Sequence, residues 1–105
     1  MKNLGTFAAE DHILHLAWSP DGTRLLATPA SGSILVARQD GETLETLPGH
    51  GMGNGESAWF QDAPATCGFD GKVRLAGTEW NPGRGLIERV KTSPDGKFLA
   101  AAQGK

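Results

Sequence analysis

Short apolar runs separated by turn-forming residues recur along the whole chain. The clearest run ends at Trp18, is reversed by the SPDG stretch Ser19–Gly22, and resumes at Leu25. Proline fits the second position of a turn because its φ is already fixed, and glycine gives the chain freedom where it bends back. The pattern therefore predicts two antiparallel strands joined by a tight turn. It returns at Val90–Ala101, where a second SPDG stretch precedes another apolar run.

Further stretches, in which polar and apolar residues alternate or β-branched residues are frequent, predict additional strands beside this hairpin. Together they form units of several strands. The four predicted strands between Ile13 and Leu47 are joined by short turns that contain glycine or proline. In the second unit, Gln61–Pro64 takes the place of SPDG. The predicted strands are residues 3–8, then 13–18, 24–28, 33–37 and 43–47, then 57–60, 65–69, 72–76 and 78–80, and finally 86–92 and 98–102.

The units repeat with a period near 40 residues. Asp21 and Asp95 are 74 positions apart, the turn glycines Gly32 and Gly71 are 39 apart, and Trp18 and Trp59 are 41 apart. Four strands per period are typical of β-propeller blades. We therefore predict an all-β fold of four-stranded antiparallel propeller blades in an incomplete ring. Its expected parts are a lead-in strand (1–12), blade 1 (13–50), blade 2 (51–85) and the first half of blade 3 (86–105).

Four stretches of the chain resemble WD-repeat β-propellers or their close bacterial relatives. They are LAWSPDGTRLLAT at 16–28, the Gly49-His50 pair, FDGKVRL at 69–75 and SPDGKFLAA at 93–101, and the resemblance covers most of residues 4–105. The resemblance implies a protein-protein interaction scaffold with no catalytic activity of its own. The family's Trp-Asp pair is absent, because Ala37-Arg38 and Ala76-Gly77 occupy its places.

The resemblance also implies a hydrogen-bonded network inside each blade, with a histidine, a hydroxyl, an aspartate and an indole. His50 and Asp70 stand at two of these places, whereas Gly68 and Ala76 stand where the hydroxyl and the indole would be. We therefore expect only a His50–Asp70 contact. Turn and packing positions are assigned structural roles, namely Trp18, Asp21, Gly22, His50, Asp70, Gly71, Asp95 and Gly96.

Composition supports a globular protein and excludes some partners. The 105 residues are 38% hydrophobic and 21% charged, with 15 glycines and 6 prolines, which suits many short strands. The net charge of −2 leaves no basic footprint for nucleic acid or an anionic membrane surface. No signal peptide or apolar membrane-spanning segment is apparent, and we expect a cytoplasmic protein.

Residues with catalytic or metal-binding chemistry do not form a recognisable pattern. His12, His15, His50 and Cys67 match no zinc spacing, and His12 and His50 are explained as equivalent turn residues. Cys67 lies in an apolar strand, and the glycine-rich stretch 51–55 precedes a strand rather than a phosphate-binding helix. We expect no catalytic residue, cofactor or metal. The alternative is a segment of a propeller enzyme, lactonase-like or another hydrolase, whose active site needs further blades.

Surface residues for binding other proteins or peptides are predicted at Met52, Phe69, Trp80 and Arg84. Propellers close with about four to eight blades, and an unclosed array leaves apolar blade faces in water. Two explanations remain open for a chain that contains only about two and a half blades. The chain is a fragment of a longer propeller, which we favour, or copies of it form a homo-oligomer that completes the ring.

Overall fold

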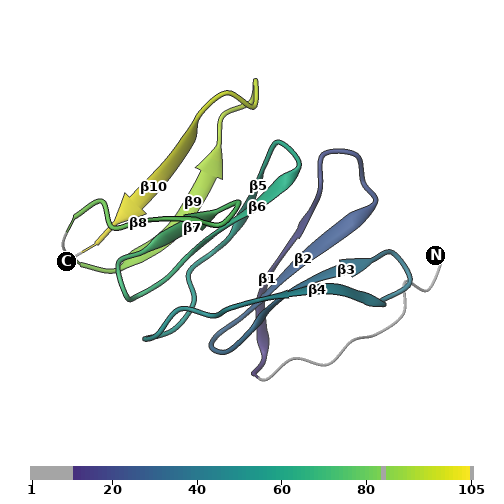
Figure 1. Ribbon diagram of the computed structural model, residues 1–105, viewed down its shortest axis with the longest axis horizontal. Coiled ribbons are helices and arrows are strands. Elements are labelled where there is room, and N and C mark those ends of the chain that lie inside the picture. The colour runs from purple at the N-terminus through teal and green to yellow at the C-terminus, as the bar shows by residue number, and fades with distance from the viewer. Residues whose placement is uncertain (1–10, 84, 105) are drawn as a thin grey trace.

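All regular structure in the described residues is β-strand, and it forms three sheets (Figure 1). The computed structural model describes residues 11–83 and 85–104. Blade 1 is the sheet β1 (Ile13–Trp18), β2 (Arg24–Pro29), β3 (Ile34–Arg38) and β4 (Thr43–Leu47). Blade 2 is β5 (Ala58–Phe60), β6 (Ala63–Cys67), β7 (Val73–Leu75) and β8 (Thr78–Trp80). Half-blade 3 is the pair β9 (Ile87–Thr92) and β10 (Leu99–Gln103).

Within each sheet, every strand pairs antiparallel with its neighbour along the chain. The predicted all-β fold of four-stranded antiparallel blades is confirmed, and Figure 1 shows the sheets following one another without closing into a ring. The outer strand predicted at 78–80 is present as β8. The predicted lead-in strand at 3–8 lies outside the described residues.

The SPDG stretches form the same hydrogen-bonded turn in both places. Asp21 Oδ1 accepts hydrogen bonds from the Ser19 hydroxyl at 2.7 Å and from the Thr23 amide at 3.0 Å. The bond from Ser19, followed by the bonds from Thr23, lowers the pKa of Asp21 to about 2. Asp95 accepts the equivalent bonds from Ser93 and from the Lys97 amide. These bonds link residues only two apart, so the turn is specified locally.

Glycine is required in this turn because the backbone is left-handed there. Gly22 and Gly96 both have φ of 75°, and a Cβ at either position would meet no atom within 4 Å. Gly22→Val and Gly96→Val should each lower the unfolding free energy by about 1–3 kcal/mol through backbone strain alone. Urea unfolding measures this. Gly22→Asn is the matched control and should cost less, because asparagine tolerates this region; equal costs for valine and asparagine would contradict the argument.

The second unit uses a shorter turn than the sequence pattern predicted. Only Gln61 and Asp62 connect β5 to β6, with Gln61 at φ 57°, while Ala63 and Pro64 already belong to β6. The prediction that Gln61–Pro64 occupies the place of SPDG is therefore wrong. The pairing of Phe60 with Ala63 leaves room for a two-residue turn only.

The apolar cores lie between the sheets rather than within them. Leu26, Ile34 and Val36 of blade 1 pack against Trp59 of blade 2. On its other face, blade 2 contributes a second core with Ile87 and Val90 of half-blade 3. Because each sheet buries its apolar face only against its neighbour, the order of the blades determines which side chains are covered.

Candidate functional site

A buried histidine in the loop before blade 2 connects that loop to β6 and to the turn that follows β6. With its side chain fully buried, His50 places Nδ1 3.0 Å from Asp70 Oδ1 and Nε2 3.1 Å from the Thr66 hydroxyl. A carboxylate only accepts hydrogen bonds, so Nδ1 carries the proton and Nε2 accepts from Thr66. Asp70 also accepts from the backbone amides of Gly51 and Lys72.

The hydroxyl of this network comes from Thr66, and the expectation of a His50–Asp70 contact alone is wrong. Gly68 was predicted at the hydroxyl position, but a Cβ there would overlap Cβ and Cγ of His50. Thr66 lies two residues earlier on β6, and a period of two keeps both positions on one face of the strand. That spacing is the signal that could have found Thr66 from the sequence.

His12 does not occupy the same place in its blade as His50. The His12 carbonyl accepts from the Ala30 amide, just as the Gly53 carbonyl accepts from the Phe69 amide, both at 3.0 Å. His12 therefore corresponds to Gly53, and the prediction that His12 and His50 are equivalent is wrong. Its ring pairs with the neighbouring Asp11 at the surface.

The charge state of His50 makes stability depend on pH. Burial lowers the pKa of His50, and the bond to Asp70 opposes this without reversing it. The unfolded chain then binds a proton at His50 more readily, so stability from neutral His50 is present above about pH 6.5 and is lost on acidification. Burial raises the pKa of Asp70, but bonds from His50 and two amides outweigh it, so Asp70 titrates below its ordinary 3.8.

We therefore expect the stability difference between the wild-type chain and His50→Gln to narrow as pH falls from about 7 to about 5. Chemical unfolding at several pH values measures the two unfolding free energies. The other histidines are common to both chains and cancel in the difference. A difference that widens on acidification would instead show that His50 is a protonated partner of Asp70.

The loop between the blades is tied to blade 1 by a buried asparagine. Asn54 donates to the carbonyls of Pro29 and Gly32, both at 3.0 Å, and its side-chain oxygen accepts from the His50 amide at 2.9 Å. Asn54 was not singled out in the sequence, where it stood between glycines. These bonds place Met52 and Gly53 at the surface beside the turn that follows β6.

Two of the predicted binding residues lie together on that surface. Met52 is 75% exposed, and a Cβ on the adjacent Gly53 would lie 3.3 Å from the ring of Phe69, which is 41% exposed. Trp80 is 46% exposed on β8, the outer strand of blade 2, where it pairs with Val73. Arg84 lies outside the described residues.

Phe69 also borders a hollow between β1, the loop before β5 and β9, which we call the inner-strand cavity. It has a volume of about 270 Å³, and its lining includes Leu14, His15, Glu56, Glu88 and Arg89. Glu56 Oε1 lies 3.1 Å from His15 Nε2 and 3.0 Å from Lys91 Nζ. Glu88 is exposed and makes no ion pair with any described residue.

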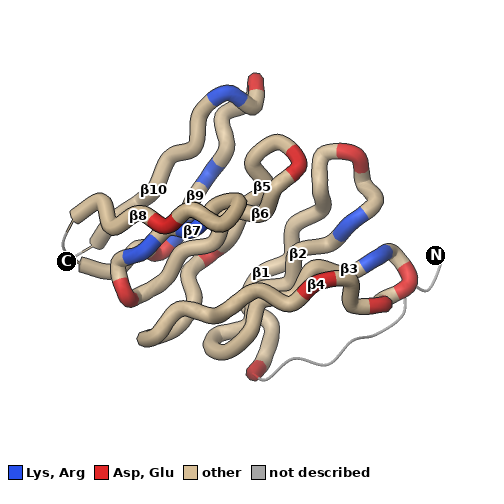
Figure 2. Tube along the Cα trace, in the orientation of Figure 1, with Lys and Arg blue, Asp and Glu red and all other residues tan. Residues whose placement is uncertain are grey.

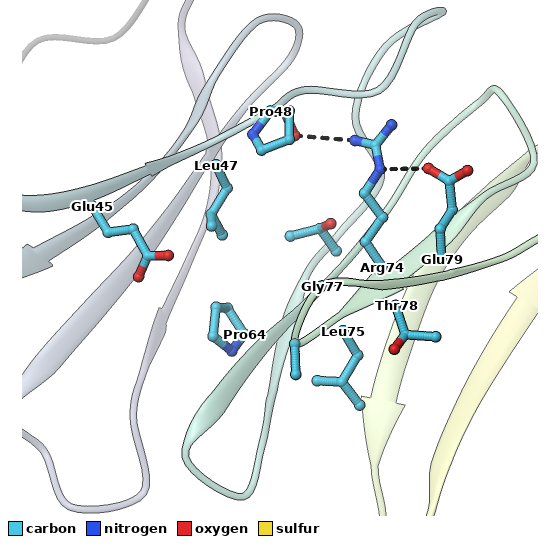
Figure 3. A pocket seen from close by; sticks show the side chains of 11 residues that line it. Glu45, Leu47, Pro48, Pro64, Arg74, Leu75, Gly77, Thr78 and Glu79 are labelled. Carbon is cyan, nitrogen blue, oxygen red and sulfur yellow. Dashed lines mark hydrogen bonds and ion pairs between the residues drawn. The ribbon is translucent and has the colours of Figure 1, made fainter.

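A second hollow, the inter-blade groove, lies between β4 and the outer part of blade 2 (Figure 3). It has a volume of about 420 Å³, and Figure 3 shows Leu47, Pro64 and Leu75 pointing into it. Arg74 closes one end by bonding Glu79 at 2.8 Å and the Gly49 carbonyl at 3.0 Å. No sequence signal indicated this groove, because its walls come from different blades.

The described residues that carry reactive or metal-binding side chains do not form a catalytic or metal site. Cys67 is buried, and burial raises the pKa of its thiol to about 12, so it is not a thiolate at neutral pH. Among residues 11–83 and 85–104, no group of three or more His, Cys, Asp or Glu is placed to hold a metal ion. The same residues contain no helix that could cross a membrane. Acidic and basic residues are scattered over all three sheets (Figure 2).

Comparison with known proteins supports the WD-type propeller fold. Residues 1–36 match the family model described as WD domain, G-beta repeat. A chain in the crystal structure of the mitotic checkpoint complex superimposes with a TM-score of 0.75 at 21% identity, over 89% of this chain and 33% of that one. The structure of U3-55K gives a TM-score of 0.78 at 18% identity, over 94% of this chain and 33% of that one.

A comparison with curated proteins found no match to this sequence. The chain spans about a third of the length of the solved chains that it resembles. The four-stranded antiparallel sheet that begins at β1 agrees with the family match at the N-terminal end. The chain therefore has the fold of about two and a half WD-type blades and resembles part of a WD-repeat β-propeller.

Proposed function

We propose that this chain is part of a non-catalytic scaffold that binds another protein through the inner-strand cavity. The observation that carries the proposal is the combination of exposed apolar and charged groups around that cavity. Phe69 and Leu14 present apolar surface there, and Glu88, which is exposed and makes no ion pair with residues 11–83 or 85–104, lies at its border. Aromatic side chains beside charged groups are typical of protein-binding hot spots.

The cavity favours a peptide segment that carries an apolar side chain next to a lysine or arginine. The apolar side chain would cover Phe69 and Leu14, while the cation would pair with Glu88. Glu56 is less available, because His15 and Lys91 already contact its carboxylate. The WD-type propeller fold is compatible with binding a peptide segment, although fold alone does not establish function.

Selection from a displayed random-peptide library tests the proposal. Peptides enriched on the wild-type chain should combine an apolar and a basic residue. Their affinity should fall roughly tenfold or more in Phe69→Ser and in Glu88→Gln, since hot-spot residues cost more than a tenfold change each. Trp80→Ser is the control, because Trp80 is similarly exposed but does not border the cavity.

Three outcomes would contradict the proposal. The first is that peptides are enriched no more on the wild-type chain than on Phe69→Ser, and the second is that their binding depends on Trp80 instead. The third outcome is one metal ion per purified chain together with turnover of an ester or lactone, which would support the alternative of a propeller enzyme.

A further inference from the structure

The inter-blade groove is an apolar hollow with charged groups at its sides. Its lining residues come from β4 of blade 1, from β6, β7 and β8 of blade 2, and from the segments that adjoin these strands. Leu47 packs against the core between blades 1 and 2, whereas Leu75 packs against the core between blade 2 and half-blade 3. Both side chains stay half-buried. The groove therefore lies where these two cores do not meet, between two sheets that each have four strands.

Small residues keep the groove open on the side of blade 2. The turn from β7 to β8 consists only of Ala76 and Gly77, because Leu75 pairs with Thr78. Both turn residues have a positive φ, 50° for Ala76 and 81° for Gly77, as a two-residue hairpin turn of type I′ requires. Their side chains add a single methyl group to the groove wall. A bulky group from another molecule therefore has room beside Leu75.

Arg74 is held in place at one side of the groove. Its Nε donates to Glu79 at 2.8 Å, and its Nη1 donates to the Gly49 carbonyl at 3.0 Å. These bonds lie in the plane of the guanidinium and leave its faces without a partner. A planar cation of this kind stacks on aromatic rings, as Arg24 does on Trp59 between the same two blades, 4.6 Å from the ring centroid. This side of the groove therefore suits an aromatic ring.

The opposite side of the groove carries a carboxylate that is free to pair with a ligand. Glu45 is exposed on β4 and makes no ion pair with residues 11–83 or 85–104. Figure 3 shows Glu45 across the groove from Arg74 and Glu79, with apolar side chains in between. The lining contains two glutamates and one arginine, which gives it a net charge of −1. Because Arg74 and Glu79 pair with each other, this charge is concentrated at Glu45, where a cation is favoured.

We propose that the inter-blade groove binds an extended peptide segment of another protein, in which an aromatic residue and a lysine or arginine are two positions apart. Side chains two positions apart in an extended segment point the same way and are separated by about 7 Å. The ring covers Leu75 and stacks on Arg74, and the cation pairs with Glu45. The groove shares no lining residue with the inner-strand cavity, so the proposal does not rest on the proposed function.

Fluorescence anisotropy with labelled peptides tests the proposal on the 105-residue chain. A peptide with the central sequence Trp-Ser-Lys should bind the wild-type chain roughly fivefold more tightly than one with Trp-Ser-Glu, as expected for an exposed ion pair. Replacing the peptide tryptophan by serine should weaken binding roughly tenfold or more. Glu45→Lys should reverse the preference between the first two peptides. Glu88→Lys is the matched control, because Glu88 is also exposed but borders the inner-strand cavity, and it should leave the preference unchanged.

Reversal of the preference cannot come from a variant that merely fails to fold, because an unfolded chain loses binding to both peptides. Absence of binding to the wild-type chain overturns the proposal, as does equal binding of the lysine and glutamate peptides or an unchanged preference in Glu45→Lys. A preference that reverses in Glu88→Lys instead places the peptide in the inner-strand cavity, which overturns this proposal and supports the proposed function. Displacement of the peptide by an equal concentration of tryptamine identifies a small amine as the occupant and also overturns it.

Discussion

Gly68→Ala is expected to lower the unfolding free energy by about 3 kcal/mol, at the top of the range for overpacking a buried site. The added methyl group would overlap Cβ and Cγ of His50 and would lie 2.7 Å from the Gly53 carbonyl oxygen. The His50 side chain cannot move away easily, because Asp70 and Thr66 hold its ring. The Gly53 carbonyl oxygen cannot move easily either, because it belongs to the backbone. Urea unfolding followed by circular dichroism measures the loss.

Gly51→Ala is the matched control in the same part of the fold. A Cβ at Gly51 would meet no atom within 4 Å, and Gly51 does not have a positive φ. Its replacement should change stability little, or raise it slightly by restricting the unfolded chain. Equal losses in Gly68→Ala and Gly51→Ala would show that the approach of His50 to β6 is not what requires glycine.

Trp59→Ala is expected to cost about 3–5 kcal/mol, the usual range for removing a large buried aromatic side chain. Trp59 fills the core between blades 1 and 2, where it contacts Leu26, Ile34 and Val36. Its removal also leaves the Ala17 carbonyl without the indole donor and Arg24 without the ring beneath it. Chemical unfolding in dilute solution measures the effect, and the variant chain is expected to be largely unfolded if its total stability is small.

Trp18→Ala provides the comparison, because Trp18 holds the corresponding position in blade 1. The side chain is 45% exposed, so its loss should cost far less than the loss of Trp59 when the chain is too dilute to associate. A similar cost at the two positions would mean that Trp18 is covered as Trp59 is, which would contradict its exposure in this structure.

The candidate site could be predicted only in part. Phe69 and Met52 were recognised as surface residues from their places in a turn and a loop, and the structure brings them together beside Gly53. Trp80 was grouped with them, but it lies on the outer strand β8 and does not border the inner-strand cavity. Leu14 and Glu88 were missed, because they come from different sheets and no spacing along the chain relates them.

The sequence by itself determined most of the strands, their antiparallel pairing and the SPDG turns, but not the two-residue turn between β5 and β6. These features depend on residues close together along the chain, such as Asp21 with Ser19 and Thr23. Only the tertiary structure decided which of two corresponding tryptophans is buried. Trp59 is covered while Trp18 is exposed because burial depends on the neighbouring blade, and blade 1 packs over Trp59 with Leu26, Ile34 and Val36.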